Sequence, residues 1–202
     1  MENNYKTILF DFDGVLSNGR FYKEFLLPEY SEAYDWIQKN IFGNKDLVKS
    51  WMRNEINSKD VNKMISKNTG LEYELLNNLY RQSIYRMELS DDVMETAMSL
   101  RSKGVKIGIV TDNMDIFTEI IVPNHKLNYL FDVVVNSADY GILKNDVDGK
   151  LFDIALNLLG QELKDCLMID DSESTVELLN NKGSRGFLYK NIAELKSFLQ
   201  IE

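Results

Sequence analysis

The sequence KTILFDFDGVL (residues 6–16) contains a short apolar run that leads directly into two acidic residues. Thr7–Phe10 combines β-branched, aliphatic and aromatic side chains, which predicts a buried strand. Because side chains alternate in direction along a strand and its extension, Asp11 and Asp13 are expected on the same face. Two neighbouring carboxylates repel each other unless a proton or a cation lies with them. Taken alone, Asp11 and Asp13 are also typical of loop carboxylates that cap the next segment. The residues at the other strand ends must therefore decide between a cap and a cation site.

The composition is that of a globular protein of 202 residues, with 44% hydrophobic and 27% charged residues. This length accommodates one ordinary domain or a core with a modest insert. The net charge of -9 argues against nucleic acid or an anionic membrane surface as a partner. The single cysteine, Cys166, excludes an internal disulfide network and fits a reducing compartment. With no apolar run of membrane-spanning length and no signal-like N-terminus, the sequence predicts a cytoplasmic location.

Apolar runs and helical patterns alternate along most of the chain. Five runs are predicted as strands: Thr7–Phe10, Val105–Val110, Val133–Val135, Cys166–Ile169 and Gly186–Leu188. This alternation predicts the α/β class, with a Rossmann-like parallel sheet that is covered by helices on both faces and has the first strand at its centre. Ligands of such sheets bind at the carboxyl ends of the strands.

Residues 18–86 interrupt the alternation with helical patterns only. The clearest are Asp46–Asn54, Ser58–Lys67 and Glu72–Arg86, each with an apolar stripe at helical spacing. We predict that residues 18–86 form a small helical cap domain, and that residues 1–17 and 87–202 form the α/β core domain. The alternative is that these helices merely extend the main core.

Polar side chains follow the second and fourth predicted strands. Thr111 and Asp112 end the second, where a hydroxyl and free backbone N–H groups form either a phosphate cradle or a simple helix cap. Asp170 and Asp171 end the fourth, and adjacent acids at a buried strand end indicate a metal site, although they also cap helices. Carboxylate oxygens are hard ligands of the kind that Mg²⁺ prefers.

Four motifs now stand in order: DFDGVL, GIVTDN, a lysine (Lys144) after NSADYG, and MIDDSES. Together they resemble the haloacid dehalogenase-like hydrolase superfamily over nearly the whole chain. The resemblance is to the subclass whose helical cap is inserted between the first and second motifs. Each motif alone is weak, whereas four in this order at strand ends are specific.

The resemblance implies roles for individual residues in phosphoryl transfer. Asp11 would be the nucleophile that forms an aspartyl-phosphate, and Asp13 would be the general acid and base. Lys144 would neutralise Asp11 and the phosphoryl group. Thr111 would bind a phosphoryl oxygen, with Asp112 beside it as a further phosphate-binding position.

The same resemblance implies a Mg²⁺ cofactor held by Asp11, Asp13, Asp171 and Asp170. Asp171 would be a direct ligand, Asp13 would contribute its backbone carbonyl, and Asp170 would be a ligand or would orient one. A divalent ion and a lysine are needed because an attacking carboxylate and a phosphate monoester carry like charges.

The third motif departs from the family pattern. Asn145 follows Lys144 where the family usually has proline, and this makes Lys150 a rival for the same role. We prefer Lys144, because Ser137 and Gly141 precede it at the usual spacing. A second departure is Asn54, which stands in the cap where that group often has glycine.

The predicted function is that of a Mg²⁺-dependent phosphatase acting on a small phosphorylated metabolite, as a monomer or homodimer. Asp13 favours phosphate monoesters, because the dehalogenase branch lacks this second acid. Two alternatives remain open: a phosphotransferase such as a sugar-phosphate mutase, and a non-catalytic Mg²⁺- or phosphate-binding protein. Arg20 and Arg53 are candidate cap cations for substrate contact. His125, in a predicted loop, is expected to be solvated, and Cys166 to be an inert core residue.

Overall fold

Five parallel strands form one sheet at the centre of the computed structural model, which describes residues 5–19, 21–27 and 29–201. The strands are β1 (Thr7–Phe10), β2 (Lys106–Thr111), β3 (Val133–Asn136), β4 (Cys166–Asp170) and β5 (Arg185–Leu188). Their spatial order is β3-β2-β1-β4-β5, so β1 is central. The predicted α/β class, the five strands and the central place of β1 are therefore confirmed.

The register aligns the carboxyl ends of the three central strands. Phe10 of β1 lies opposite Ile109 of β2 on one side and Ile169 of β4 on the other. The three strands therefore end at the same edge of the sheet, at Phe10, Thr111 and Asp170. This edge is where the sequence motifs meet.

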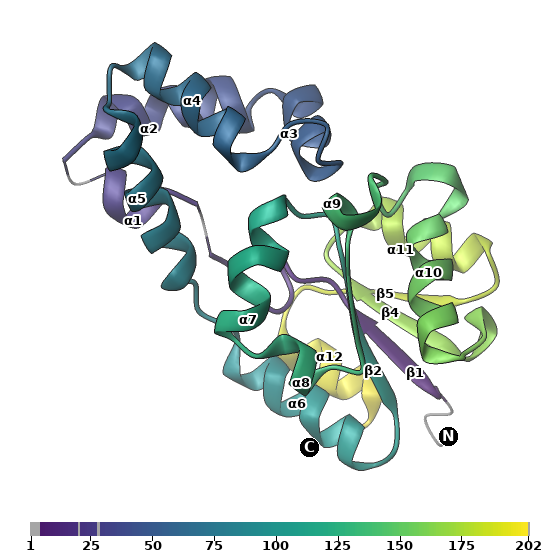
Figure 1. Cartoon of the computed structure of the whole chain (residues 1–202). Coiled ribbons are helices and arrows are strands. Elements are labelled where there is room, and N and C mark those ends of the chain that lie inside the picture. Colours follow the sequence, from purple (N-terminus) through teal and green to yellow (C-terminus); the bar gives the residue numbers. More distant parts are fainter. Residues whose placement is uncertain (1–4, 20, 28, 202) are drawn as a thin grey trace.

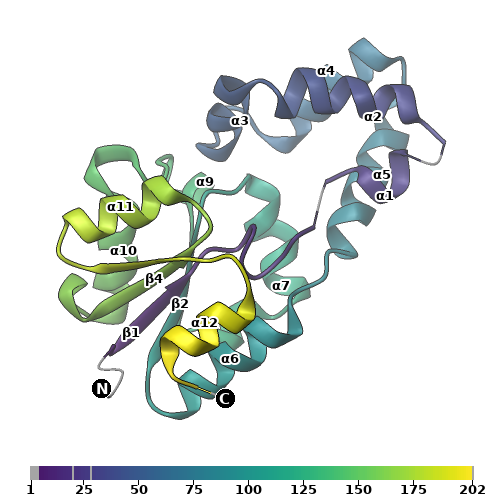
Figure 2. The ribbon, with the colours of Figure 1, turned by 180° about the vertical axis from the view of Figure 1, so that it is seen from behind.

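Helices cover both faces of the sheet, as Figures 1 and 2 show. On one face, α10 (Lys150–Leu159) and α11 (Glu173–Asn181) pack against Leu9, Val110 and Met168. The opposite face is covered by α6 (Asp91–Ser102) and α12 (Ile192–Leu199), which lie side by side in Figure 2. Alternation along each strand explains this division, because adjacent residues point to opposite faces.

Short helices fill the remaining connections of the sheet. They are the π-helix η2 (Phe117–Ile121), α7 (Val122–Asn124), α8 (Leu127–Leu130), α9 (Ser137–Tyr140), and the 3-10 helices η3 (Asp146–Asp148) and η4 (Leu163–Asp165). The first three, with Phe117 and Leu127, add to the α6 side of the core. In the described part of the chain, no helix combines the length and apolar character needed to cross a membrane.

Helices alone connect β1 to α6 over residues 21–27 and 29–85. They are α1 (Lys23–Leu26), α2 (Ser31–Ile37), the π-helix η1 (Gln38–Phe42), α3 (Lys45–Met52), α4 (Ser58–Thr69) and α5 (Tyr73–Tyr85). Figure 1 shows this helical insert standing apart from the sheet's own helices. Local signals explain its elements: the Asn57 side chain accepts the Asp60 N–H at the start of α4, and Gly70 ends α4 in the left-handed conformation.

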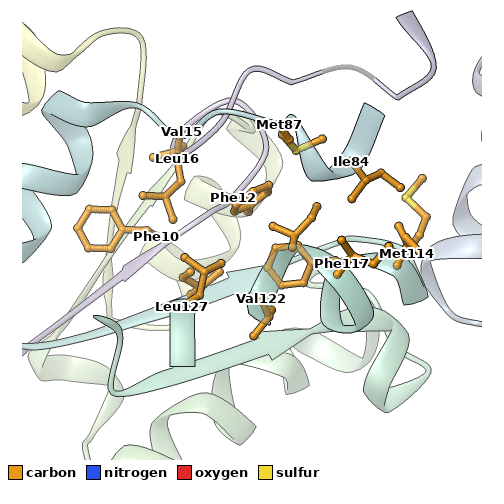
Figure 3. Close-up of a cluster of buried hydrophobic side chains, with 14 of the residues drawn as sticks. Phe10, Phe12, Val15, Leu16, Ile84, Met87, Met114, Phe117, Val122 and Leu127 are labelled. Carbon is orange, nitrogen blue, oxygen red and sulfur yellow. The ribbon is translucent and has the colours of Figure 1, made fainter. Parts of the chain in front are cut away.

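The apolar core runs without a break from the sheet into the helical insert. Figure 3 shows Ile84, at the end of the insert, and Met87, just after it, in one cluster with Phe12, Met114 and Phe117. Phe12 and Phe117 pack edge to face with ring centroids 4.9 Å apart. The insert therefore shares apolar contacts with the sheet domain, and its division into a separate cap over residues 18–86 stays a prediction.

We expect Leu9→Ala to lower the free energy of unfolding by about 2–5 kcal/mol, because Leu9 is fully buried in the central strand and its truncation leaves a cavity. The matched control is Leu158→Ala on α10, where the side chain is 63% exposed and the change should stay within about 0.5 kcal/mol. Denaturant unfolding followed by circular dichroism measures both. Equal losses would mean that β1 is not the centre of the core.

Candidate active site

The site lies at the carboxyl edge of the sheet, where the ends of β1, β2 and β4 bring their next residues together. Asp11 follows β1 directly, Thr111 is the last residue of β2, and Asp170 is the last of β4. All three are buried. Lys144 reaches them from the segment between α9 and η3. Residues that are far apart in the sequence thus meet because the strands are parallel and in register.

Lys144 is the cation at the centre of this cluster. Its Nζ donates to Asp11 Oδ2 at 2.5 Å and to Asp170 Oδ2 at 2.7 Å, and its side chain is 5% exposed. Burial alone lowers the pKa of Lys144, but the Asp11, Asp170 and Asp112 carboxylates outweigh burial and raise it, so the ammonium stays charged. Lys150, its rival from the sequence, is exposed at the start of α10. The contact with Asp11 thus favours Lys144.

The carboxylates around Lys144 form a group suited to a divalent cation. One oxygen each of Asp11, Asp170 and Asp171 lies within 4.8 Å of the others. Oxygens on opposite sides of a Mg²⁺ ion lie about 4 Å apart, so small side-chain adjustments would close this set around one ion. Three carboxylates beside the single Lys144 ammonium leave two negative charges, which a divalent cation would balance. The donor chemistry therefore fits Mg²⁺.

Burial raises the pKa of Asp11 to about 7, an effect that Lys144 opposes and Asp170 reinforces. The carboxylate is fixed in orientation by the Phe12 N–H, which donates to Asp11 Oδ1 at 2.7 Å. Its other oxygen faces Lys144. A positive charge beside Asp11 would favour its ionised form, the form that a nucleophile requires.

The Thr111 hydroxyl is buried and has no hydrogen-bond partner among the described residues. A buried hydroxyl without a partner is costly unless a ligand oxygen completes it, so Thr111 fits its predicted phosphate contact. Asp112 instead accepts the Lys144 backbone N–H at 2.7 Å, and burial raises the pKa of Asp112. Its carboxylate thus positions the Lys144 segment, and a part in phosphate binding stays a prediction.

Asp13 is oriented by residues for which the sequence suggested no role. Asn113 Nδ2 donates to Asp13 Oδ2 at 3.0 Å, and the buried Ser137 Oγ accepts the Asn113 N–H at 3.0 Å. Ser137 Oγ in turn donates to the Met52 carbonyl of the helical insert at 2.7 Å. The orientation of Asp13 is thereby connected to the seating of the insert. The only sequence signal was that Asn113 directly follows Asp112.

Two carboxylates of the sheet domain also bind the insert. Asp115 accepts the Ser58 N–H at the start of α4 (3.0 Å to Oδ2) and the Trp51 indole N–H (3.2 Å to Oδ1). Asp146, shortly after Lys144, forms a two-bond ion pair with Arg53 at 2.8 and 2.9 Å. This pairing lowers the pKa of Asp146 and raises that of Arg53. Arg53 is therefore engaged with a protein carboxylate.

The remaining sequence expectations for the insert and for other chemistry have mixed outcomes. Asn54 has φ of 56°, the left-handed conformation that glycine would adopt without strain. Arg20 lies outside the described residues.

Cys166 is buried, which raises its pKa to about 12 and agrees with an inert thiol. The expectation that His125 is solvated was wrong: it is half-buried, and burial lowers its pKa.

A cavity of about 350 Å³ adjoins Asp13 between the sheet edge and the helical insert. The described residues that line it are Asp13, Gly19, Phe21, Gln38, Phe42, Val48, Met52 and Met114. Asp13 also acts on the charge of Asp11, so it lies near both the charged cluster and this cavity. We refer to this space below as the Asp13 cavity.

The sequence profile of the family described as "haloacid dehalogenase-like hydrolase" matches residues 5–181. This range contains all four motifs and every residue of the site. The chain belongs to this family. Pyrophosphatase PpaX of Bacillus mycoides is 26% identical over 184 residues, which cover 89% of this hydrolase and 80% of the relative. Phosphoserine phosphatase of Methanocaldococcus jannaschii is 23% identical over 212 residues, which cover 100% and 94% of the two chains.

A solved structure agrees with the fold of this hydrolase. A HAD family enzyme from Bacteroides thetaiotaomicron, crystallised with magnesium and inorganic phosphate, superposes with a TM-score of 0.67. It is 16% identical, and the match covers 92% of this hydrolase and 94% of that enzyme.

Gly14 explains how the backbone of this hydrolase passes so close to Asp171. Its φ of 77° is left-handed, and a Cβ placed on it would lie 2.1 Å from Asp171 Oδ2. Any side chain would therefore push the Asp171 carboxylate out of the cluster, at little cost to the fold because the displaced atoms end a side chain. Only glycine combines an unstrained left-handed φ with the absence of a Cβ beside Asp171.

We expect Gly14→Ala to weaken Mg²⁺ binding by about 10–100-fold, as displacing a metal-site carboxylate does. Gly70→Ala is the matched control: its φ is 76°, but an added Cβ would meet nothing within 4 Å. Both variants carry the same backbone strain, of about 1–2 kcal/mol, whereas only the first displaces Asp171. Calorimetric titration measures the Mg²⁺ affinity of both variants. Equal affinities would mean that Asp171 is not a ligand of the metal.

Proposed function

We propose that this hydrolase is a Mg²⁺-dependent phosphatase that cleaves a small phosphorylated metabolite through an aspartyl-phosphate intermediate. The observation that carries the proposal is Lys144, held between Asp11 and Asp170 beside Asp171. The phosphatase names of two relatives and the phosphate bound to a third support the same chemistry. We propose equally that the protein is cytoplasmic and a monomer or homodimer.

Asp11, Asp170 and Asp171 would hold Mg²⁺ with their carboxylate oxygens, and Asp13 with its backbone carbonyl. When bound, Mg²⁺ supplies positive charge that offsets the repulsion between an anionic nucleophile and the phosphate. Lys144 supplies the second positive charge, because its ammonium contacts the nucleophile directly. Thr111 would donate its unpartnered hydroxyl to a phosphoryl oxygen.

In the first step, an Asp11 carboxylate oxygen attacks phosphorus as the ester P–O bond breaks. The electron pair of that bond goes to the leaving oxygen, and Asp13 gives this oxygen a proton, so a neutral alcohol departs. The position of Asp13 supports this role, since it lies between the charged cluster and the cavity. Asp11 now carries the phosphoryl group as a mixed anhydride.

In the second step, water attacks phosphorus and loses a proton to the Asp13 carboxylate. The anhydride P–O bond breaks, inorganic phosphate forms, and the Asp11 carboxylate is restored. Dividing the displacement in two lets the same acid–base residue assist both halves. The helical insert, proposed as a cap over residues 18–86, would exclude bulk water and select the alcohol.

A phosphotransferase would share the first step but return the phosphoryl group to a sugar hydroxyl. Product analysis separates the two, because hydrolysis yields free phosphate and transfer yields an isomeric sugar phosphate. A non-catalytic binding protein has no need of Asp13 held toward the cavity by Asn113. This contact therefore favours an enzyme.

We expect wild-type protein to release inorganic phosphate from at least one phosphorylated metabolite with Mg²⁺ and not with EDTA. Asp11→Asn should lose at least about 10³-fold of this activity, because the amide is a poor nucleophile. A colorimetric phosphate assay over a metabolite panel measures both. Appreciable turnover by Asp11→Asn would remove Asp11 as the nucleophile, whereas EDTA-resistant release would contradict the metal requirement.

Lys144→Met should reduce kcat by about 100-fold or more, because the buried cation beside Asp11 is lost while the volume of the side chain is kept. The control is Lys150→Met, which removes the same charge from an exposed position and should leave kcat within about twofold. Circular dichroism verifies that both variants fold. A larger loss in Lys150→Met would reassign the third motif.

A further inference from the structure

The Asp13 cavity is built mainly from apolar side chains. Phe21, Phe42, Val48 and Met52 come from the helical insert, and Met114 from the segment after β2. Gln38 is the one side chain among the described lining residues that offers a hydrogen-bonding group besides Asp13. In the proposed reaction the leaving alcohol occupies this space, because Asp13 must reach the leaving oxygen.

Other aromatic rings pack against the two phenylalanines of the Asp13 cavity and hold them in place. Phe21 packs on Trp51 and Tyr80 with ring centroids 6.5 and 5.8 Å apart, and Phe42 packs on Trp51 at 6.3 Å. Trp51 and Tyr80 are buried. Rigid aromatic surfaces select ligands by shape and apolar contact, because they cannot turn aside to expose polar groups.

Hydrogen bonds with polar side chains hold the backbone of the two methionines of the wall. The Met52 carbonyl accepts from Ser137 Oγ at 2.7 Å, and the Met114 N–H donates to Asn113 Oδ1 at 2.9 Å. Asn113 and Ser137 are the residues that orient Asp13. The apolar walls and the proton donor are therefore parts of one connected arrangement.

The charges around the Asp13 cavity disfavour an ionic leaving group. Of the described residues that line it, none is lysine, arginine or histidine, and Asp13 is itself acidic. Arg53, a cation of the insert near the cavity, is paired with Asp146. A second phosphate or a carboxylate on the leaving group would thus be desolvated with no cationic partner among the described lining residues, which is strongly unfavourable.

Resting on the proposed function, we propose that the substrate is the phosphate monoester of an uncharged, largely apolar alcohol, such as an arylalkyl or branched alkyl alcohol. Gln38 offers one amide for a single polar group on it, too few partners for the hydroxyls of a sugar. A cavity of about 350 Å³ holds roughly ten non-hydrogen atoms at the volume that a water molecule occupies in the liquid. The alcohol is therefore small.

The test compares four substrates with Mg²⁺: 2-phenylethyl phosphate, O-phosphoserine, glucose 6-phosphate and pyrophosphate. The first three release comparable primary alcohols, so differences in kcat/KM among them report the cavity. We expect 2-phenylethyl phosphate to exceed the other three by about 10–100-fold. An Asp11-dependent preference for phosphoserine, glucose 6-phosphate or pyrophosphate would overturn the substrate class and leave the proposed function standing.

A pair of charge variants tests whether the Asp13 cavity sets this preference. Gln38→Lys adds a cation at the cavity, and Asn40→Lys adds the same charge at an exposed position of η1 that does not line it. We expect Gln38→Lys to raise kcat/KM for pyrophosphate by about fivefold, and Asn40→Lys to leave it unchanged. Equal effects of the two variants would mean that the cavity does not receive the leaving group.

Binding to Asp11→Asn separates recognition from chemistry. With Mg²⁺ present, calorimetry should give 2-phenylethyl phosphate a Kd at least about tenfold below that of O-phosphoserine. If wild type releases phosphate from no substrate while this preference holds, the proposed function fails and the ligand class stands. Weaker binding of 2-phenylethyl phosphate than of O-phosphoserine would overturn the ligand class directly.

Discussion

The charged cluster at the carboxyl edge of the sheet depends on the attraction between one buried ammonium, that of Lys144, and the carboxylates of Asp11 and Asp170. Without a cation among them, these acids would repel each other at the edge of a sheet whose interior is apolar. The parallel order of β2, β1 and β4 brings the acids together, and Asp112 fixes the segment that carries Lys144 through its backbone. The single lysine leaves a negative excess among these acids, and this excess makes the edge suitable for a divalent metal.

The same edge also seats the helical insert. Asp115 binds the start of α4, Asp146 binds Arg53, and Ser137 binds the Met52 carbonyl. Asp115 lies between β2 and β3, and Ser137 and Asp146 lie between β3 and α10, so the segments that shape the charged cluster also set the position of the insert. Because Asn113 connects Ser137 to Asp13, the Asp13 carboxylate is oriented by the same network.

Charge and apolar surface are divided between the two parts of the molecule. The sheet domain supplies the acids and the lysine, which the family shares as motifs, whereas the helical insert supplies most of the apolar wall of the Asp13 cavity. Under the proposed function, the sheet domain would hold the phosphate and the helical insert would hold the leaving alcohol, so one phosphoryl chemistry would serve different alcohols. The continuous apolar core between the parts keeps Phe12 and Phe117 in contact and supports both.

The sequence by itself determined the α/β class and the five strands, and it pointed to the acids of the charged cluster, because apolar periodicity and strand-end acids are local patterns. It left Lys144 and Lys150 as rivals, since spacing cannot show which lysine is buried against Asp11. It suggested no role for Asn113, Ser137 or Asp146, whose side chains act across contacts far apart in the chain. It also misjudged His125, whose burial depends on tertiary packing. Only the tertiary structure decided these points and the apolar character of the Asp13 cavity, because they arise where distant segments meet.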